Sequence, residues 1–327
     1  MRKTTHLSYI DHAKSIGILL MIIGHVWTVD PAIRQFIYSF HMPLFFIIAG
    51  FLYKHVPFRQ RISKDWRSLL LPYLLINLCC MAIRLSIPLI TEPGYPFWPH
   101  LLAQTGAVLI GESLPQYGLE PVCGPSWFIL AIFFLHMLRY LPLPGFLLSA
   151  MAIAVAWLLR HFQIDIPGPL DAAVMAYPFF YAGELLRRIN WQQLSGLRVA
   201  ITLALSMFLT WIMNRYNGAV DINVLQYGRN MAIYYLCACT GTLAVWTFSL
   251  LLERLSWSKL ETFASVMAAG TIVVVGFHRF FIAAAEQLLP MTPVQSLFVG
   301  LAIFLAFFPI NLFCEKYIPV LTGFRRS

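Results

Sequence analysis

Charged residues are scarce in this chain. Only 11% of its 327 residues are Asp, Glu, Lys or Arg, whereas soluble domains carry about 25%. In contrast, 59% are hydrophobic, and the mean hydropathy is +0.72. Apolar runs recur along the whole length, each close to the roughly 20 residues needed to cross hydrocarbon. This composition excludes a water-soluble fold and predicts an all-α, polytopic integral membrane helix bundle.

Several patterns of known chemistry are also missing. The sequence has no Gly-rich phosphate loop, no Gly-x-Ser-x-Gly nucleophile elbow and no metal-spaced cluster of His and Asp. Its six cysteines show neither zinc spacing nor a disulfide framework, so we interpret them as small apolar residues in helix packing. We therefore expect no metal and no ATPase-type site.

The apolar runs predict about ten transmembrane helices within a single domain, residues 1–327, with no appended soluble domain. We place them at residues 10–29, 33–53, 69–90, 125–141, 144–160, 171–186, 198–214, 229–252, 261–285 and 294–313. No small-residue cleavage site follows the first run, so we expect it to be retained.

Basic residues decide the orientation. Most of the 23 Lys and Arg fall on one side of these spans, including Arg2, Lys3, Arg325 and Arg326 near the termini. The positive-inside rule then predicts that both termini lie in the cytoplasm. The net charge of +9 is explained by topology, and we expect no nucleic-acid partner.

The first span carries ionisable side chains. Lys14 and His25 are eleven residues apart, so on a helix both lie within about 20° of one face and roughly 16 Å apart along the axis. Ionisable residues inside a bilayer are expensive and are functional candidates. Asp11 precedes Lys14 by three residues and either pairs with it at the cytoplasmic edge or has a ligand role.

The second span contains His41, two residues before Pro43. Because proline removes a backbone hydrogen bond, we expect this helix to bend beside His41. Histidine suits general-base work, since its pKa lies near neutrality. Between Lys14 and His25, the glycines Gly17 and Gly24 allow either close helix packing or room for a slender ligand.

Basic and polar residues also occur outside the first two spans. Lys64 and Arg67 are three residues apart and present two cations on one side of a helical turn. They either bind a polyanion, such as the phosphates of a nucleotide or coenzyme A, or set topology and contact anionic lipid. In the outer half of the bundle, further side chains could line a polar cavity: Arg84, Arg229, His278 and Arg279. Trp127 lies at the outer interface, where an aromatic belt is common.

Several of these segments together resemble the membrane-bound acyltransferase family 3. The similar segments are Tyr9-Ile-Asp-x-Ala-Lys14 with His25, Phe40-His-Met-Pro through Gly50, Lys64-x-x-Arg67, Leu71-Pro-Tyr73, Trp127 to Phe133, Phe179 to Gly183, and Gly270 to His278. The Phe-His-Met-Pro form is most similar to the fucose O-acetylase branch.

This resemblance implies a ten-helix acyltransferase of the bacterial cytoplasmic (inner) membrane. Such a protein moves an acyl group, usually acetyl, from cytoplasmic acetyl-CoA to a sugar hydroxyl of lipopolysaccharide O-antigen, exopolysaccharide or an oligosaccharide. The family's basic-to-histidine motif falls on Lys14 and His25, and its second basic motif on Lys64 and Arg67. Lysine at position 14 keeps the charge of the family's arginine but loses its bidentate fork.

We therefore expect three sets of site residues. His25 acts as general base or as a transient acyl carrier, and His41 and Asp11 belong to the same catalytic set. The acyl-CoA donor binds Lys14, Lys64 and Arg67. The glycan acceptor, lipid-linked or free, binds Arg84, Trp127, Arg229, His278 and Arg279.

The residues also allow a second function. A transporter or flippase for a lipid-linked or polar sugar would use the same outer cationic cavity, with membrane lipids as its other partners. A purely structural role would leave the polar residues of the spans unexplained. The acceptor sugar, the acyl group and the oligomeric state are left open by the sequence.

Overall fold

The computed structural model describes residues 7–111, 118–120, 122–166, 168–288 and 290–323. In these ranges the regular structure is helical, apart from one isolated bridge between Asp221 and Gln226. The helices are α1 (Ser8–His25), α2 (Pro31–Tyr38), α3 (His41–Leu52), α4 (Phe58–Asp65), α5 (Leu71–Thr91), α6 (Phe97–Ile110), α7 (Trp127–Leu138), α8 (Gly145–His161), α9 (Leu170–Leu186), α10 (Gly196–Asn217), α11 (Met231–Arg254), α12 (Ser258–Ala269), α13 (Thr271–Leu288) and α14 (Pro293–Tyr317). Short helical turns lie at Trp66–Leu70, Gly124–Ser126, Trp191–Gln193, Ile222–Val224 and Pro319–Thr322.

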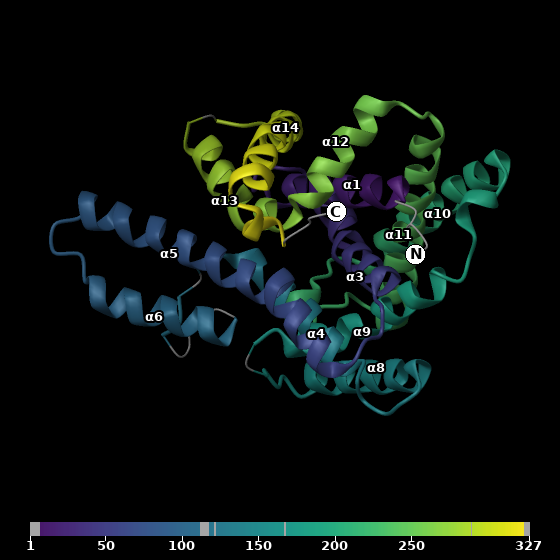
Figure 1. Cartoon of the computed structure of the whole chain (residues 1–327), viewed down its shortest axis with the longest axis horizontal. Coiled ribbons are helices and arrows are strands. Elements are labelled where there is room, and N and C mark those ends of the chain that lie inside the picture. Colours follow the sequence, from purple (N-terminus) through teal and green to yellow (C-terminus); the bar gives the residue numbers. More distant parts are fainter. Residues whose placement is uncertain (1–6, 112–117, 121, 167, 289, 324–327) are drawn as a thin grey trace.

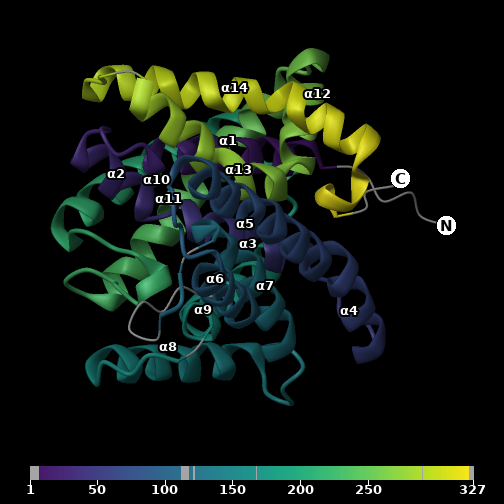
Figure 2. The same ribbon diagram turned by 90° about the vertical axis from the view of Figure 1, so that its left-hand side faces the viewer.

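Helices α1 and α3 form the centre of the bundle (Figures 1 and 2). Helix α1 packs against α3, α11, α12, α13 and α14, and α3 packs against α9 and α11. Helix α14 lies at one edge in Figure 2 and α8 at the opposite edge, where it packs on α9. The two predicted first spans, which carry His25 and His41, are therefore the most enclosed part of the fold.

Two glycines let α3 and α9 touch backbone to backbone. A Cβ added at Gly50 would collide with the carbonyl oxygen of Phe180, and one added at Gly183 would collide with the carbonyl oxygen of Ile47. Small residues at a crossing allow helices in a membrane to approach closely. This contact fixes α3, and with it His41, against the rest of the bundle.

The expected bend beside His41 is confirmed as a full break. Asp30 caps α2 by accepting hydrogen bonds from the amides of Ala32 and Ile33, at 2.8 and 3.4 Å. The chain leaves helical geometry at Phe40, and α3 begins at His41. The range predicted as one span, 33–53, is therefore two helices joined beside the histidine.

A second predicted span is also divided. The range 261–285 contains α12 and α13, which are separated at Gly270. A side chain at Gly270 would collide with the amide of Asn311 on α14. The prediction of one continuous helix over this range was wrong, because the glycine that allows this close approach also ends α12.

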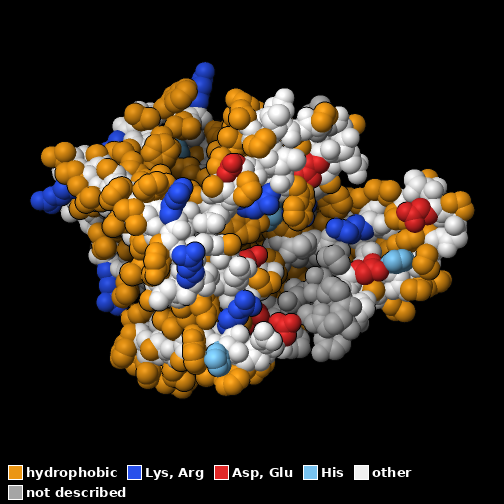
Figure 3. Space-filling view, turned by 180° about the vertical axis from the view of Figure 1, so that it is seen from behind, with side chains coloured by type: hydrophobic (Ala, Val, Ile, Leu, Met, Phe, Trp, Pro, Cys, Tyr) orange, Lys and Arg blue, Asp and Glu red, His pale blue; other side chains and the backbone are white. Residues whose placement is uncertain are grey.

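Six helical stretches among the described residues are long and apolar enough to cross a membrane. They are Pro31–Leu52, Phe58–Thr91, Gly196–Asn217, Met231–Arg254, Thr271–Leu288 and Pro293–Tyr317. Helix α6 pairs with α5, and this hairpin projects from the bundle (Figure 1). Hydrophobic side chains cover much of the face in Figure 3. These features are those of a membrane helix bundle.

The count of ten spans and the orientation stay predictions. The four basic residues nearest the termini, Arg2, Lys3, Arg325 and Arg326, lie outside the described residues.

Candidate active site

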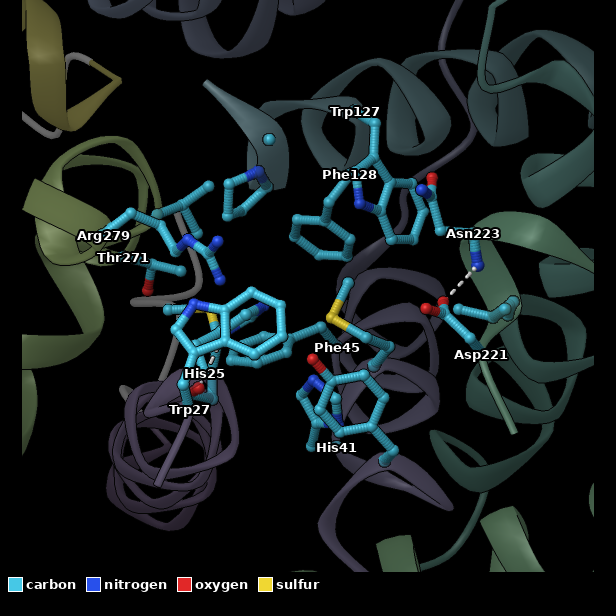
Figure 4. A pocket seen from close by; sticks show the side chains of 17 residues that line it. His25, Trp27, His41, Phe45, Trp127, Phe128, Asp221, Asn223, Thr271 and Arg279 are labelled. Atoms are coloured by element: carbon cyan, nitrogen blue, oxygen red, sulfur yellow. Dashed lines mark hydrogen bonds between the residues drawn. The ribbon is translucent and has the colours of Figure 1, made fainter. Parts of the chain in front are cut away.

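The cavity that contains His25 is formed by segments far apart in the sequence. Its volume is about 260 Å³, and we call it the His25 cavity. In Figure 4, Trp127 and Phe128 face His25 and His41 across the space, and Asp221 and Asn223 lie at the opposite end from Thr271 and Arg279. Its walls come from α1, α2, α3, α7, α13 and the segment between α10 and α11.

Hydrogen bonds fix which nitrogen of His25 carries the proton. Its Nδ1 lies 2.8 Å from the carbonyl oxygen of Met21 and 3.3 Å from Nε2 of His278. Nδ1 of His278 lies 2.7 Å from the carbonyl oxygen of Val274. Since a carbonyl only accepts, both Nδ1 atoms donate, and Nε2 of His278 is left as an acceptor. The Nε2 lone pair of His25 therefore remains available to accept a proton.

His41 follows the same pattern. Its Nδ1 donates to the carbonyl oxygen of Ile37 at 3.0 Å, so its Nε2 is also unprotonated when the ring is neutral. Its ring centroid lies 6.5 Å from that of His25 and 5.0 Å from that of Tyr38. The described residues contain no group of His, Cys, Asp and Glu arranged to hold a metal ion.

Asp221 adds a carboxylate to this cavity. The residue lies in the connection between α10 and α11, and its side chain accepts a hydrogen bond from the amide of Asn223 at 2.9 Å. Burial raises the pKa of the Asp221 carboxyl above its ordinary range. Sequence reasoning missed this residue, because an aspartate in a connecting segment usually reads as part of a turn.

A second cavity surrounds Lys14, and we call it the Lys14 cavity. Its volume is about 330 Å³, and its lining includes Tyr53, Arg61 and His136. The Arg61 guanidinium carbon lies 4.7 Å from the centroid of the Tyr53 ring, and its Nη1 lies 3.4 Å from Oδ1 of Asp65. Nδ1 of His136 lies 2.9 Å from Oδ2 of the same carboxylate. Sequence reasoning missed this buried network.

The two cavities meet end to end along α1. Phe45, Phe128 and Thr271 line both of them. The Phe45 and Phe128 rings are in edge-to-face contact, with centroids 5.6 Å apart. A Cβ at Gly17 would lie 2.8 Å from Cζ of Phe45, so this glycine makes room for the phenyl ring.

Of the two explanations for the glycines between Lys14 and His25, close packing is therefore the one the structure shows. Gly24 likewise packs against Ile37 and Tyr38, and a Cβ there would lie 3.2 Å from each side chain.

The remaining predicted residues take several positions. Lys64 and Arg67 are exposed beside Arg61 and Ser68, which line the Lys14 cavity. Asp11 is buried on α1, about one turn before Lys14.

Arg229 does not line the His25 cavity. It is exposed, with its guanidinium carbon 6.0 Å from the centroid of the Tyr216 ring. Arg84 lines a further cavity together with Arg279. The structure thus brings His25, His41, His278, Arg279 and Trp127 together and places the other predicted residues elsewhere.

The sequence is similar to one known protein family along nearly its whole length. The acyltransferase domain family matches residues 7–314, nearly the whole chain. The chain belongs to this acyltransferase family. The resemblance found in the motifs is therefore confirmed at the level of the family.

One curated relative shows how far the similarity reaches. The chain is 30% identical over 204 residues to the nodulation protein NolL of Mesorhizobium japonicum (strain LMG 29417 / CECT 9101 / MAFF 303099). The aligned region covers 56% of this chain and 48% of NolL, so the chain spans about half the length of that relative. No solved structure matches the chain. The fucose O-acetylase branch stays a prediction.

Proposed function

We propose that this acyltransferase transfers an acyl group, acetyl in the first instance, from acyl-CoA to a hydroxyl of a surface polysaccharide, O-antigen or related glycan. One observation carries the proposal. The cavity containing Lys14 and the cavity containing His25 adjoin at Phe45 and Phe128, so one end can receive a donor and the other an acceptor.

The donor fits the Lys14 cavity. Lys14 and Arg61 line it, and Lys64 and Arg67 are exposed nearby, which suits the phosphates of coenzyme A. The pantetheine arm would then extend along α1 toward the Phe45–Phe128 contact. Lys14 and His25 are separated by roughly 16 Å along the helix axis, a span comparable to that arm.

The acceptor fits the His25 cavity, and His25 is the base. Nε2 of His25 takes the proton of the acceptor hydroxyl while its oxygen attacks the thioester carbonyl. The new C–O ester bond forms, the C–S bond breaks, and the departing thiolate takes the proton back from His25. The acceptors at Nδ1, on Met21 and His278, stabilise the imidazolium formed between these steps.

Replacement of His25 by alanine tests the proposal. We expect acetyl transfer to fall by about 100- to 10,000-fold, with little change in acetyl-CoA binding. The measurement is mass spectrometry of surface glycans from cells producing each variant, together with acetyl-CoA turnover by the purified protein.

His161→Ala is a matched control, because His161 is an exposed histidine stacked on Trp157, with ring centroids 4.9 Å apart. Undiminished acetyl transfer in His25→Ala would overturn the assignment of His25.

A further inference from the structure

A third cavity of about 400 Å³ adjoins the His25 cavity. Arg84 of α5 and Arg279 of α13 line it, and we call it the arginine cavity. Arg279 and Trp27 also line the His25 cavity, as do Gly124 and Pro125. The two cavities therefore adjoin at these shared residues.

The arginine cavity is positively charged. Its lining contains one carboxylate, that of Glu286, and this group already accepts a hydrogen bond from the amide of Trp27 at 2.7 Å. Within the described residues, neither Arg84 nor Arg279 forms an ion pair with a carboxylate. Two guanidinium groups thus line a cavity whose one lining carboxylate already accepts a hydrogen bond.

Arg279 contacts the ring of Trp27. The Arg279 guanidinium carbon lies 5.6 Å from the centroid of the Trp27 ring, within the range of a cation–π contact. The guanidinium of Arg34 lies 5.6 Å from the same ring, but it is bound to the carbonyl oxygens of Val26 and Trp27, both at 2.7 Å. Arg34 therefore holds the turn after α1 in place, while Arg279 stays at the junction of the two cavities.

From this arrangement we propose that the acceptor carries a phosphate group that binds in the arginine cavity while its sugar hydroxyl lies at His25. Arginine matches a phosphate because its planar fork donates two parallel hydrogen bonds to phosphate oxygens. Arg279 joins recognition of the anion to the reaction site, and Arg84 supplies the second cation. This inference rests on the proposed function, because it names the chemical class of the acceptor for that same site.

Binding of octyl phosphate tests the arginine cavity without requiring turnover. The protein is placed in nanodiscs of phosphatidylcholine, and the dissociation constant is measured for wild type, Arg84→Gln, Arg279→Gln and Arg215→Gln. Loss of one charge-assisted hydrogen-bond pair should weaken binding by about tenfold or more for the first two variants. Arg215→Gln is the matched control, since Arg215 is an exposed arginine whose guanidinium carbon lies 5.8 Å from the centroid of the Trp211 ring, and this variant should bind like wild type.

Two further arms separate the alternatives. If phosphatidylglycerol in the nanodisc displaces octyl phosphate, the cavity holds a lipid headgroup, and the acceptor assignment is overturned. If phosphatidylglycerol has no effect and glucosyl octyl phosphate binds more tightly than octyl glucoside, the assignment is supported. Unchanged binding in Arg84→Gln also overturns it, and this variant removes an exposed side chain, so its fold should be retained.

His25→Ala should bind octyl phosphate like wild type. A failure of acyl transfer would therefore be seen separately from a failure of the phosphate site.

Discussion

At the scale of single residues, His278 determines what His25 can do. Its Nε2 accepts from Nδ1 of His25, so it supports the tautomer that leaves Nε2 of His25 unprotonated. The same Nε2 of His278 can also accept a hydrogen bond from Nδ1 of His25 when His25 is an imidazolium. The sequence predicts that His278 binds the acceptor, and its contact with His25 adds a positioning role to that prediction.

Variants of His278 test this role. His278→Phe removes the acceptor and should lower kcat by about tenfold, the value of roughly one hydrogen bond. His278→Gln can place an amide oxygen where Nε2 was, so it should recover most of the activity. The measurement is kcat and KM for acetyl-CoA, with KM unchanged in both variants. Equal activity in the Phe and Gln variants would contradict the role.

The sequence predicted part of this residue cluster. Lys14, His25 and His41 could be related because helix periodicity and neighbouring spans connect them. The contact between His25 and His278 spans 253 residues, and that between Asp65 and His136 spans 71. Periodicity carries no information on such distant pairs, since the packing of whole helices decides them.

At the scale of helices, the crossing of α3 and α9 depends on two glycines. Gly183→Ala should destabilise the protein by about 1–3 kcal/mol, because the added methyl meets the Ile47 backbone and the helices must separate. Gly50→Ala should behave alike, since its methyl meets the backbone of Phe180. The measurement is thermal unfolding in detergent.

Gly196→Ala provides the comparison for these variants. Gly196 begins α10, and a Cβ there would lie 3.4 Å from the end of the flexible Arg254 side chain. It should leave the unfolding temperature nearly unchanged. If Gly183→Ala unfolds at the wild-type temperature, the two helices do not depend on this contact.

The positions of the helices were more predictable than their interruptions. Each range that was predicted from an apolar run contains a helix in the structure, and Pro43 indicated the break before α3. Gly270 gave no such signal, because glycine is common within membrane helices and is often tolerated there. Its effect depends on Asn311 of α14, which only the folded arrangement brings beside it.

At the scale of the whole molecule, the proposed reaction has a direction, because the donor and the acceptor would use different cavities. The Lys14 cavity and the His25 cavity lie toward opposite ends of α1, and Phe45 and Phe128 form the wall between them. A donor and an acceptor would therefore approach from opposite sides. A transporter would instead need one substrate to pass through this wall.

Reconstitution into liposomes tests this directionality. Acetyl-CoA is membrane-impermeant, so, when supplied outside, it should be used only by molecules whose Lys64–Arg67 side faces outward. A protease-sensitive tag at the C-terminus reports the fraction in that orientation, because the predicted topology puts the tag on the same side. Acetyl transfer should scale with that fraction when the acceptor is enclosed in the liposome. Turnover that needs both substrates on one side would contradict the two-sided arrangement, and sugar movement without acetyl-CoA would favour the flippase.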